Sequence, residues 1–178
     1  MLFRSIVREK DFQALPENMR EAAREAVDTL LHSGDGQLCD VIIDRAALEA
    51  ILEAGNRSKA AIIRDYAEST VAVANIKIAV RCCKTGKSLE FMKRAMAPCK
   101  TLNVERLAHA ALAGMDSIME YLSGAGYAEA ADAIKESPSA FERWCDNRII
   151  ETIKPQKTNP FSVGPLVAYV IARQNEIK

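Results

Sequence analysis

The chain has 178 residues, enough for one or two domains with a hydrophobic core. Its 49% hydrophobic and 27% charged residues exclude a disordered tail, and its 24 basic and 24 acidic residues balance, which gives no reason to expect nucleic acid binding. Aromatic residues make up only 6%, and there are only 8 glycines and 6 prolines. This composition favours an all-α fold over a β-sandwich or barrel.

Three further features bear on compartment and chemistry. No apolar run approaches the roughly 20 residues that a membrane-spanning helix needs, and charges interrupt the apolar pairs of the opening MLFRSIVREKDF, unlike in a signal peptide. The five cysteines are odd in number and include no C-x-x-C. Neither His32 nor His109 completes a zinc-binding spacing with them. We therefore expect a cytosolic protein with reduced thiols and no metal site.

The first two helices are predicted from apolar residues at helical spacing. One covers residues 16–33 and ends at Gly34; the next starts at Asp40 and ends at the stop signal Gly55-Asn56. Asp40 and Asp44 lie one turn apart, as a catalytic carboxylate pair could. Because no third polar group follows them, we interpret them as solvated or helix-entry charges.

The third helix is expected to be long and buried. The flanking signals place its cap at Ser58 and its start at Lys59, and Thr85-Gly86 ends it, although the middle, TVAVANIKIAV, is also rich in strand-forming residues. Its second half is apolar on nearly all sides, so we expect it to lie between other helices, with Asn75 as an interhelical hydrogen-bonder. TGKS at 85–88 lacks the leading glycine of a phosphate-binding loop and is interpreted as a helix-ending turn.

Shorter helices follow, and the single tryptophan, Trp144, is interpreted as a core anchor. They are predicted within residues 88–96, 103–114, 115–124, 127–136 and 137–154. A linker at 155–164 contains the loop signal Asn159-Pro160. The last helix is expected to have Gly164 as its N-cap and Pro165 in its first turn.

Two parts of the chain share an order of features, which indicates a duplicated helical subdomain. Residues 40–77 and 146–178 each contain an Asp-led helix with paired isoleucines, a turn, and a longer helix with a tyrosine, Tyr66 or Tyr169. Each longer helix then carries an asparagine followed by an Ile-Lys pair. The helix of the first copy continues for about seven residues beyond that pair, whereas the second copy ends there. We therefore expect the chain to be a fragment that ends within its last helix.

The chain resembles the family of V-type (archaeal/vacuolar-type) ATP synthase C subunits, which are related to the d subunit of the vacuolar ATPase. The resemblance covers nearly the whole chain. It is carried by DFQALPENMREAAREA, by Asp40 to Asp44 with the helix after it, by RDYAESTVAVANIKIAVR and above all by NPFSVGPLVAYVIARQNEIK. In this last stretch the matching positions are Gly164, Pro165, Tyr169, Arg173 and Glu176.

The resemblance implies a domain organisation. Family members are longer and have three similar helical subdomains around a pseudo-threefold axis, which together form a funnel. Residues 1–15 would be a connector or the remnant of a preceding subdomain, 16–136 the second subdomain, and 137–178 the beginning of the third. The first subdomain and the extreme C-terminus would be missing.

The resemblance also implies a function without chemistry. The funnel is a rotor socket that joins the central shaft, formed by the D and F subunits, to the membrane proteolipid ring. It transmits torque for ATP-coupled proton or sodium transport. We expect a non-catalytic protein on the cytoplasmic face of the membrane, held there through the ring. No catalytic, cofactor-binding or metal-binding residue and no direct contact with nucleotide are expected.

Two other functions are open on the residues alone. A helical-repeat adaptor that binds a partner peptide or helix would have the same helices. An enzyme is disfavoured, because the sequence offers no nucleophile–base pair, metal spacing or phosphate loop. A basic set is a candidate surface near a shaft or lipid headgroups, or else a merely solvated region. It consists of Arg81, Lys84, Lys87, Lys93, Arg94 and Lys100.

Overall fold

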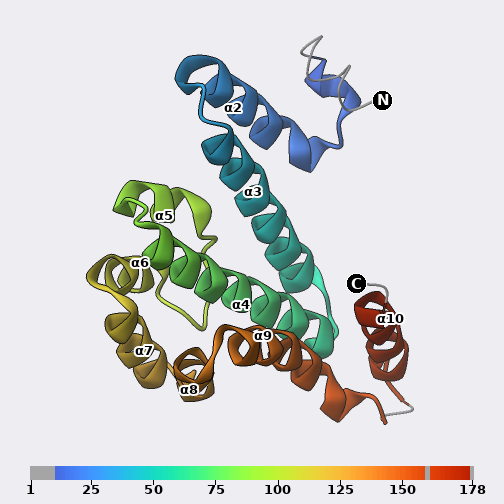
Figure 1. Cartoon of the computed structure of the whole chain (residues 1–178). Coiled ribbons are helices and arrows are strands. Elements are labelled where there is room, and N and C mark those ends of the chain that lie inside the picture. Colours follow the sequence, from blue (N-terminus) through green and yellow to red (C-terminus); the bar gives the residue numbers. More distant parts are fainter. Residues whose placement is uncertain (1–10, 159–160, 177–178) are drawn as a thin grey trace.

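The computed structural model describes residues 11–158 and 161–176, and all regular elements within them are helical (Figure 1). The predicted all-α fold is therefore confirmed. The elements are η1 (Phe12–Ala14), α2 (Glu17–Ser33), α3 (Gly36–Arg57), α4 (Ala61–Thr85), α5 (Leu89–Ala95), α6 (Val104–Ala113), α7 (Met115–Gly124), α8 (Ala128–Glu136), α9 (Pro138–Ile153), η2 (Lys154–Gln156) and α10 (Gly164–Glu176).

The helices divide into a body and an arm. Helices α4 to α9 form the body, and α2 and α3 pack along each other as an arm that extends from it (Figure 1). Helix α3 of the arm packs against α4 and α5. Helix α10 packs on α9 and on the start of α4. Sequence-distant helices thus meet at α4.

Helix α4 is the centre of the body, as its apolar pattern predicts. It contacts α3, α5, α6, α7, α9 and α10, and most of its buried residues lie between Val71 and Cys82. A helix that is apolar all round is stable in water only when neighbours cover every face. The main core cluster contains Ala72, Val73, Ile76, Ala79, Val80, Cys82, Met92, Met96, Leu102, Leu107, Ala108, Ala111, Ile118, Leu122, Tyr127, Ala130, Ala131, Phe141 and Cys145.

Most predicted helix ends are confirmed. Gly34 and Gly86 end α2 and α4 with φ of +68° and +62°, a conformation that glycine adopts without a steric cost. The side chains of Asn103 and Ser137 accept hydrogen bonds of 2.9 and 3.0 Å from the first-turn backbone of α6 and α9. These caps satisfy N–H groups that have no partner within the helix.

The predicted start of α3 at Asp40 is wrong. The helix begins at Gly36, because the carboxylate of Asp35 accepts a 3.1 Å hydrogen bond from the backbone N–H of Leu38 and so caps it one turn earlier. Asp40 therefore lies inside the helix and on its exposed side.

The predicted stop at Gly55-Asn56 is also wrong, and the reason is packing. Helix α3 continues to Arg57, and Gly55 is buried inside it. A Cβ added at Gly55 would lie 2.3 Å from the Cβ of Ala67 in α4. The glycine therefore permits a close approach of two helices and does not end one of them.

Two other predicted caps are shifted. Helix α4 begins at Ala61 and not at Lys59, because Ser58 accepts a 3.2 Å hydrogen bond from the N–H of Ala60 and closes a short turn before the helix. Gly164 is the first residue of α10 and not its N-cap. Both differences are of one or two residues and leave the helices themselves as predicted.

The repeat and the domain division remain partly untested. Asp146 lies in the middle of α9, so the second copy does not begin with an Asp-led helix. Residues 1–10 of the expected connector, the loop signal at 159–160 and the final pair at 177–178 lie outside the described residues. The division between residues 136 and 137 stays a prediction.

Candidate interaction surface

The buried Asn75 has a structural role. Its side chain is fully buried; its Nδ2 donates a 2.7 Å hydrogen bond to the carbonyl of Ala97, and its Oδ1 accepts one of 3.0 Å from the N–H of the same residue. Ala97 follows α5 in a connector, so the predicted interhelical bond is in fact a bond between a helix and a connector. It satisfies both backbone groups of a buried, non-helical residue.

Trp144 is confirmed as a core anchor. Its ring stacks on Phe141 with a centroid separation of 6.2 Å and meets Tyr127 edge-on at 6.3 Å. Offset stacking and edge contacts of this kind are the favourable aromatic geometries. The three aromatic residues fix α9 against the end of the α7–α8 connector.

The segment 85–88 is confirmed as a helix-ending turn. The N–H of Lys87 donates a 3.0 Å hydrogen bond to the carbonyl of Cys82, which closes the end of α4 around Gly86. Ser88 then caps α5 by accepting a hydrogen bond from the N–H of Phe91. The backbone of this segment thus bonds to the ends of its own two helices.

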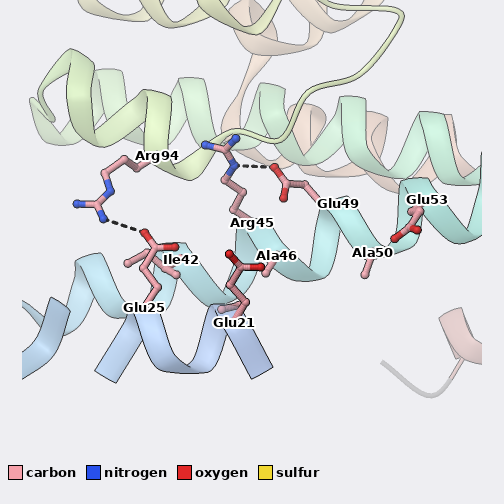
Figure 2. A pocket seen from close by; sticks show the side chains of 10 residues that line it. Glu21, Glu25, Ile42, Arg45, Ala46, Glu49, Ala50, Glu53 and Arg94 are labelled. Carbon is pink, nitrogen blue, oxygen red and sulfur yellow. Dashed lines mark hydrogen bonds and ion pairs between the residues drawn. The ribbon is translucent and has the colours of Figure 1, made fainter. Parts of the chain in front are cut away.

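A charged groove is lined by α2 and α3, with Arg94 of α5 at its edge (Figure 2). It has a volume of about 550 Å³, and its lining includes three alanines from α2 and α3. Two more carboxylates than guanidinium groups line it, so its charge is negative. The lining residues are Glu21, Ala22, Glu25, Ile42, Arg45, Ala46, Glu49, Ala50, Glu53 and Arg94.

Two arginines of this groove connect the arm helices α2 and α3 to α5. Arg94 reaches from α5 to Glu25 of α2 at 3.1 Å (Figure 2). Arg45 pairs with Glu49 at 2.8 Å and donates a 3.0 Å hydrogen bond to the backbone carbonyl of Lys93. The groove was not predicted from the sequence, although Glu21 and Glu25 in α2, like Arg45 and Glu49 in α3, are four residues apart and so share one helix face.

A second groove brings together two sets of residues that are far apart in the sequence and were interpreted separately. Its volume is about 290 Å³, and it lies between α3 and the α4–α5 turn. Asp40 and Asp44 line one wall, while Arg81 and Lys87 line the other. Lys87 also bonds to Gln37 at 2.5 Å. The carboxylates of Asp40 and Asp44 therefore share this groove with the basic side chains of Arg81 and Lys87.

The six predicted basic residues do not act as one free basic surface. Lys93 pairs with Glu105 at 3.3 Å and Arg94 with Glu25, and Lys100 donates a 3.0 Å hydrogen bond to Asn56. Arg81 and Lys84 are exposed on the last turns of α4. Lys87 also bonds to Gln37 of α3, so four of the six residues are engaged in bonds between separate parts of the fold.

Apolar side chains are exposed on α10. Leu166, Tyr169 and Val170 have exposed fractions of 66%, 64% and 46%, whereas Ile171 on the opposite side is buried against Ile62 and Ile153. One face of the helix thus packs on the body while the other presents apolar groups to solvent, as an interface does.

Burial and hydrogen bonding shift the pKa of several titratable groups of the body. Burial raises the pKa of Cys145 to about 12 and also raises the pKa of Cys82 and Cys99, so these thiols stay neutral and unreactive near neutral pH. The hydrogen bond to Glu142 raises the pKa of Lys77. Within residues 11–158 and 161–176 no three histidine, cysteine, aspartate or glutamate side chains are grouped as they would be to hold a metal ion.

Comparison with known proteins identifies a family. The family described as ATP synthase (C/AC39) subunit matches residues 2–178. Neither a curated protein nor a solved structure matches the chain. Among the described helices none has the length and apolar character required to cross a membrane. The match covers nearly the whole sequence, so it does not rest on a single motif.

Proposed function

Because the chain belongs to the ATP synthase (C/AC39) subunit family, we propose that it is a non-catalytic rotor subunit of a V-type ATP synthase or ATPase. In this role it is a socket that joins the D–F shaft to the membrane proteolipid ring. It lies on the cytoplasmic face and transmits torque for ATP-coupled proton or sodium transport. The family match over residues 2–178 is the observation that carries the proposal.

The packing of the body suits a part that transmits torque. Helix α4 contacts six other helices and is buried mainly between Val71 and Cys82, and close-packed interiors resist compression and transmit strain. The thiols of Cys82, Cys99 and Cys145 are kept neutral by burial, and the segment 85–88 is a helix-ending turn. Mechanical coupling therefore agrees with the described side chains better than catalysis does.

Two surfaces have the character of a protein interface. The groove of Figure 2 offers charged side chains, and the outer face of α10 offers apolar ones. Interfaces between proteins combine apolar anchors with a polar rim. We propose that at least one of these two surfaces contacts the shaft or the ring.

The proposal is tested by calorimetric titration of the chain with purified D–F shaft. Three variants locate the contact: Glu21→Lys in the groove, Leu166→Asp on α10, and Asp132→Lys on the exposed side of α8 as a charge-changing control. Saturable binding that one of the first two variants weakens at least about tenfold, while the control does not, supports the socket. A folded, helical chain that does not bind the shaft contradicts it.

A further inference from the structure

The second groove, between α3 and the α4–α5 turn, combines opposite charges with apolar side chains. Its carboxylates, Asp40 and Asp44, come from α3, whereas its cations, Arg81 and Lys87, come from the end of α4 and the turn after it. The apolar lining residues that are only half-buried come from α3, α4 and α5, and they are Val41, Ile78 and Phe91. Each charge sign therefore belongs to a different side of one partly apolar groove.

These charged groups are not used in ion pairs within the described part of the chain. None of the ion pairs between described residues includes Asp40, Asp44 or Arg81. Lys87 is not in an ion pair there either, because its Nζ donates a 2.5 Å hydrogen bond to the neutral amide of Gln37. Both charge signs of the groove thus lack a counter-charge at contact distance.

The groove of Figure 2 differs in this respect. Its two arginines already pair with glutamates that line the same groove, Arg45 with Glu49 at 2.8 Å and Arg94 with Glu25 at 3.1 Å. Complementary charges on two surfaces give an interaction its specificity. The second groove is the smaller of the two, but it offers unpaired charges of both signs to a partner.

The size of the groove favours a protein partner over a small molecule. Its volume of about 290 Å³ is slightly below the roughly 300–1,000 Å³ of pockets that enclose a small-molecule ligand. An apolar side chain that projects from a partner's surface needs less room. Covering the half-buried Val41, Ile78 and Phe91 with such a side chain removes more apolar area from water and so favours binding.

We propose that this groove binds an amphipathic helix of a partner protein, with basic side chains along one edge of its apolar face and acidic ones along the other. The basic edge pairs with Asp40 and Asp44, which lie one helical turn apart, as do side chains along one edge of the partner helix. The acidic edge pairs with Arg81 and Lys87. Binding of an apolar helix face in a groove is a common mode of recognition. The proposal goes beyond the rotor role and does not depend on it.

Such a helix would also hold the arm on the body. The carboxylates of the groove belong to α3 of the arm, whereas its cations belong to α4 and the turn of the body. A ligand that binds only the closed arrangement stabilises it by mass action. Binding should therefore slow hydrogen exchange in α3, which a peptide bound elsewhere would not do.

A titration of the ¹⁵N-labelled 178-residue chain with a synthetic helical peptide tests the proposal. The peptide has leucines on one face, lysines along one edge of that face and an equal number of glutamates along the other. We expect saturable shifts centred on the start of α3 and on the α4–α5 turn, with slower exchange of the α3 amides. Shifts centred on α10 or on the groove of Figure 2, or no shifts at all, overturn the proposal.

Two comparison peptides keep the leucines but carry lysines on both edges or glutamates on both edges. In each of them one edge meets a like charge in the groove, so we expect binding at least about fivefold weaker than that of the mixed peptide. Equal affinities of the three peptides would show that the opposite charges of the groove do not select its partner, which contradicts the proposal.

Charge reversals in the chain locate the contact. We expect Asp44→Lys and Arg81→Glu each to weaken binding of the mixed peptide at least about fivefold, because an attraction becomes a repulsion. The matched control is Lys84→Glu, which reverses an exposed charge on the same helix outside the groove and should change the affinity less than about twofold. Circular dichroism verifies that each variant is folded. Equal effects of Arg81→Glu and Lys84→Glu would contradict binding in this groove.

Discussion

The body and the arm are both helical, but different interactions stabilise them. In the body, long and short helices enclose one large apolar cluster around α4. The arm has a separate small cluster of Phe12, Leu15 and Ala23, and large apolar side chains such as Leu31 remain exposed. Burial of apolar surface is the dominant favourable term in folding. Two regions with the same secondary structure therefore differ in how much apolar burial stabilises them.

The first prediction compares a leucine from each region. Leu107 in α6 is fully buried, whereas Leu31 in α2 is 64% exposed. We expect Leu107→Ala to lower the free energy of unfolding by about 2–5 kcal/mol, because it leaves a cavity in the core. Leu31→Ala should change it by less than about 0.5 kcal/mol. Urea unfolding followed by circular dichroism measures both, and similar losses would show that the arm is as tightly packed as the body.

The second prediction concerns the buried amide of Asn75. Asn75→Ala leaves the N–H and the carbonyl of Ala97 without their bonds in the core, which should cost about 3 kcal/mol. The matched control is Asn103→Ala, which removes only an exposed helix cap and should cost about 1 kcal/mol. The same urea titrations measure both, and an equal cost would mean that the bonds of Asn75 do not differ from those of a surface cap.

The third prediction tests the joint between the arm and the body. Gly55→Ala places a methyl group against Ala67, so α3 must move away from α4, at a cost of about 1–3 kcal/mol. Gly124→Ala, in a helix with open space around that position, should be neutral or slightly stabilising. Thermal unfolding of both variants gives the comparison, and a neutral Gly55→Ala would show that the helices do not need their close contact.

The fourth prediction uses pH to probe the body alone. Because the folded-state pKa of the Cys145 thiol is raised to about 12 from an ordinary value of 9.0, its contribution to stability is complete below pH 9 and falls between pH 9 and 12. At pH 10 the loss relative to pH 8 should be about 1.4 kcal/mol. Urea unfolding at both pH values should show a smaller loss in Cys145→Ala than in the unchanged chain. Equal losses would contradict a buried, neutral thiol.

The sequence predicts the body better than the joints between its parts. The burial of α4 and the caps at Asn103 and Ser137 follow from local patterns, and the structure confirms them. Gly55 shows why other features do not follow. A glycine can end a helix, or it can lie inside a helix where a second helix packs closely. The sequence does not distinguish the two cases; the position of Ala67 against Gly55 does.

The candidate interaction surfaces were even harder to predict from the sequence than the contacts between helices. The basic residues form a group in the chain, but Arg94 and Lys93 bind glutamates of different helices, so their charges are compensated within the fold. The groove of Figure 2 requires α2, α3 and α5 to meet, and helix periodicity does not determine which helices meet.

Hydrogen exchange of the free chain, resolved helix by helix, tests most directly the claim that a stable body carries a more weakly held arm. Local opening costs less free energy where few apolar contacts are broken. We expect the amides of α2 to exchange at least about tenfold faster than those in the second half of α4, with α3 between them. Equal protection in α2 and α4 would contradict it, because the arm and the body would then open as one cooperative unit.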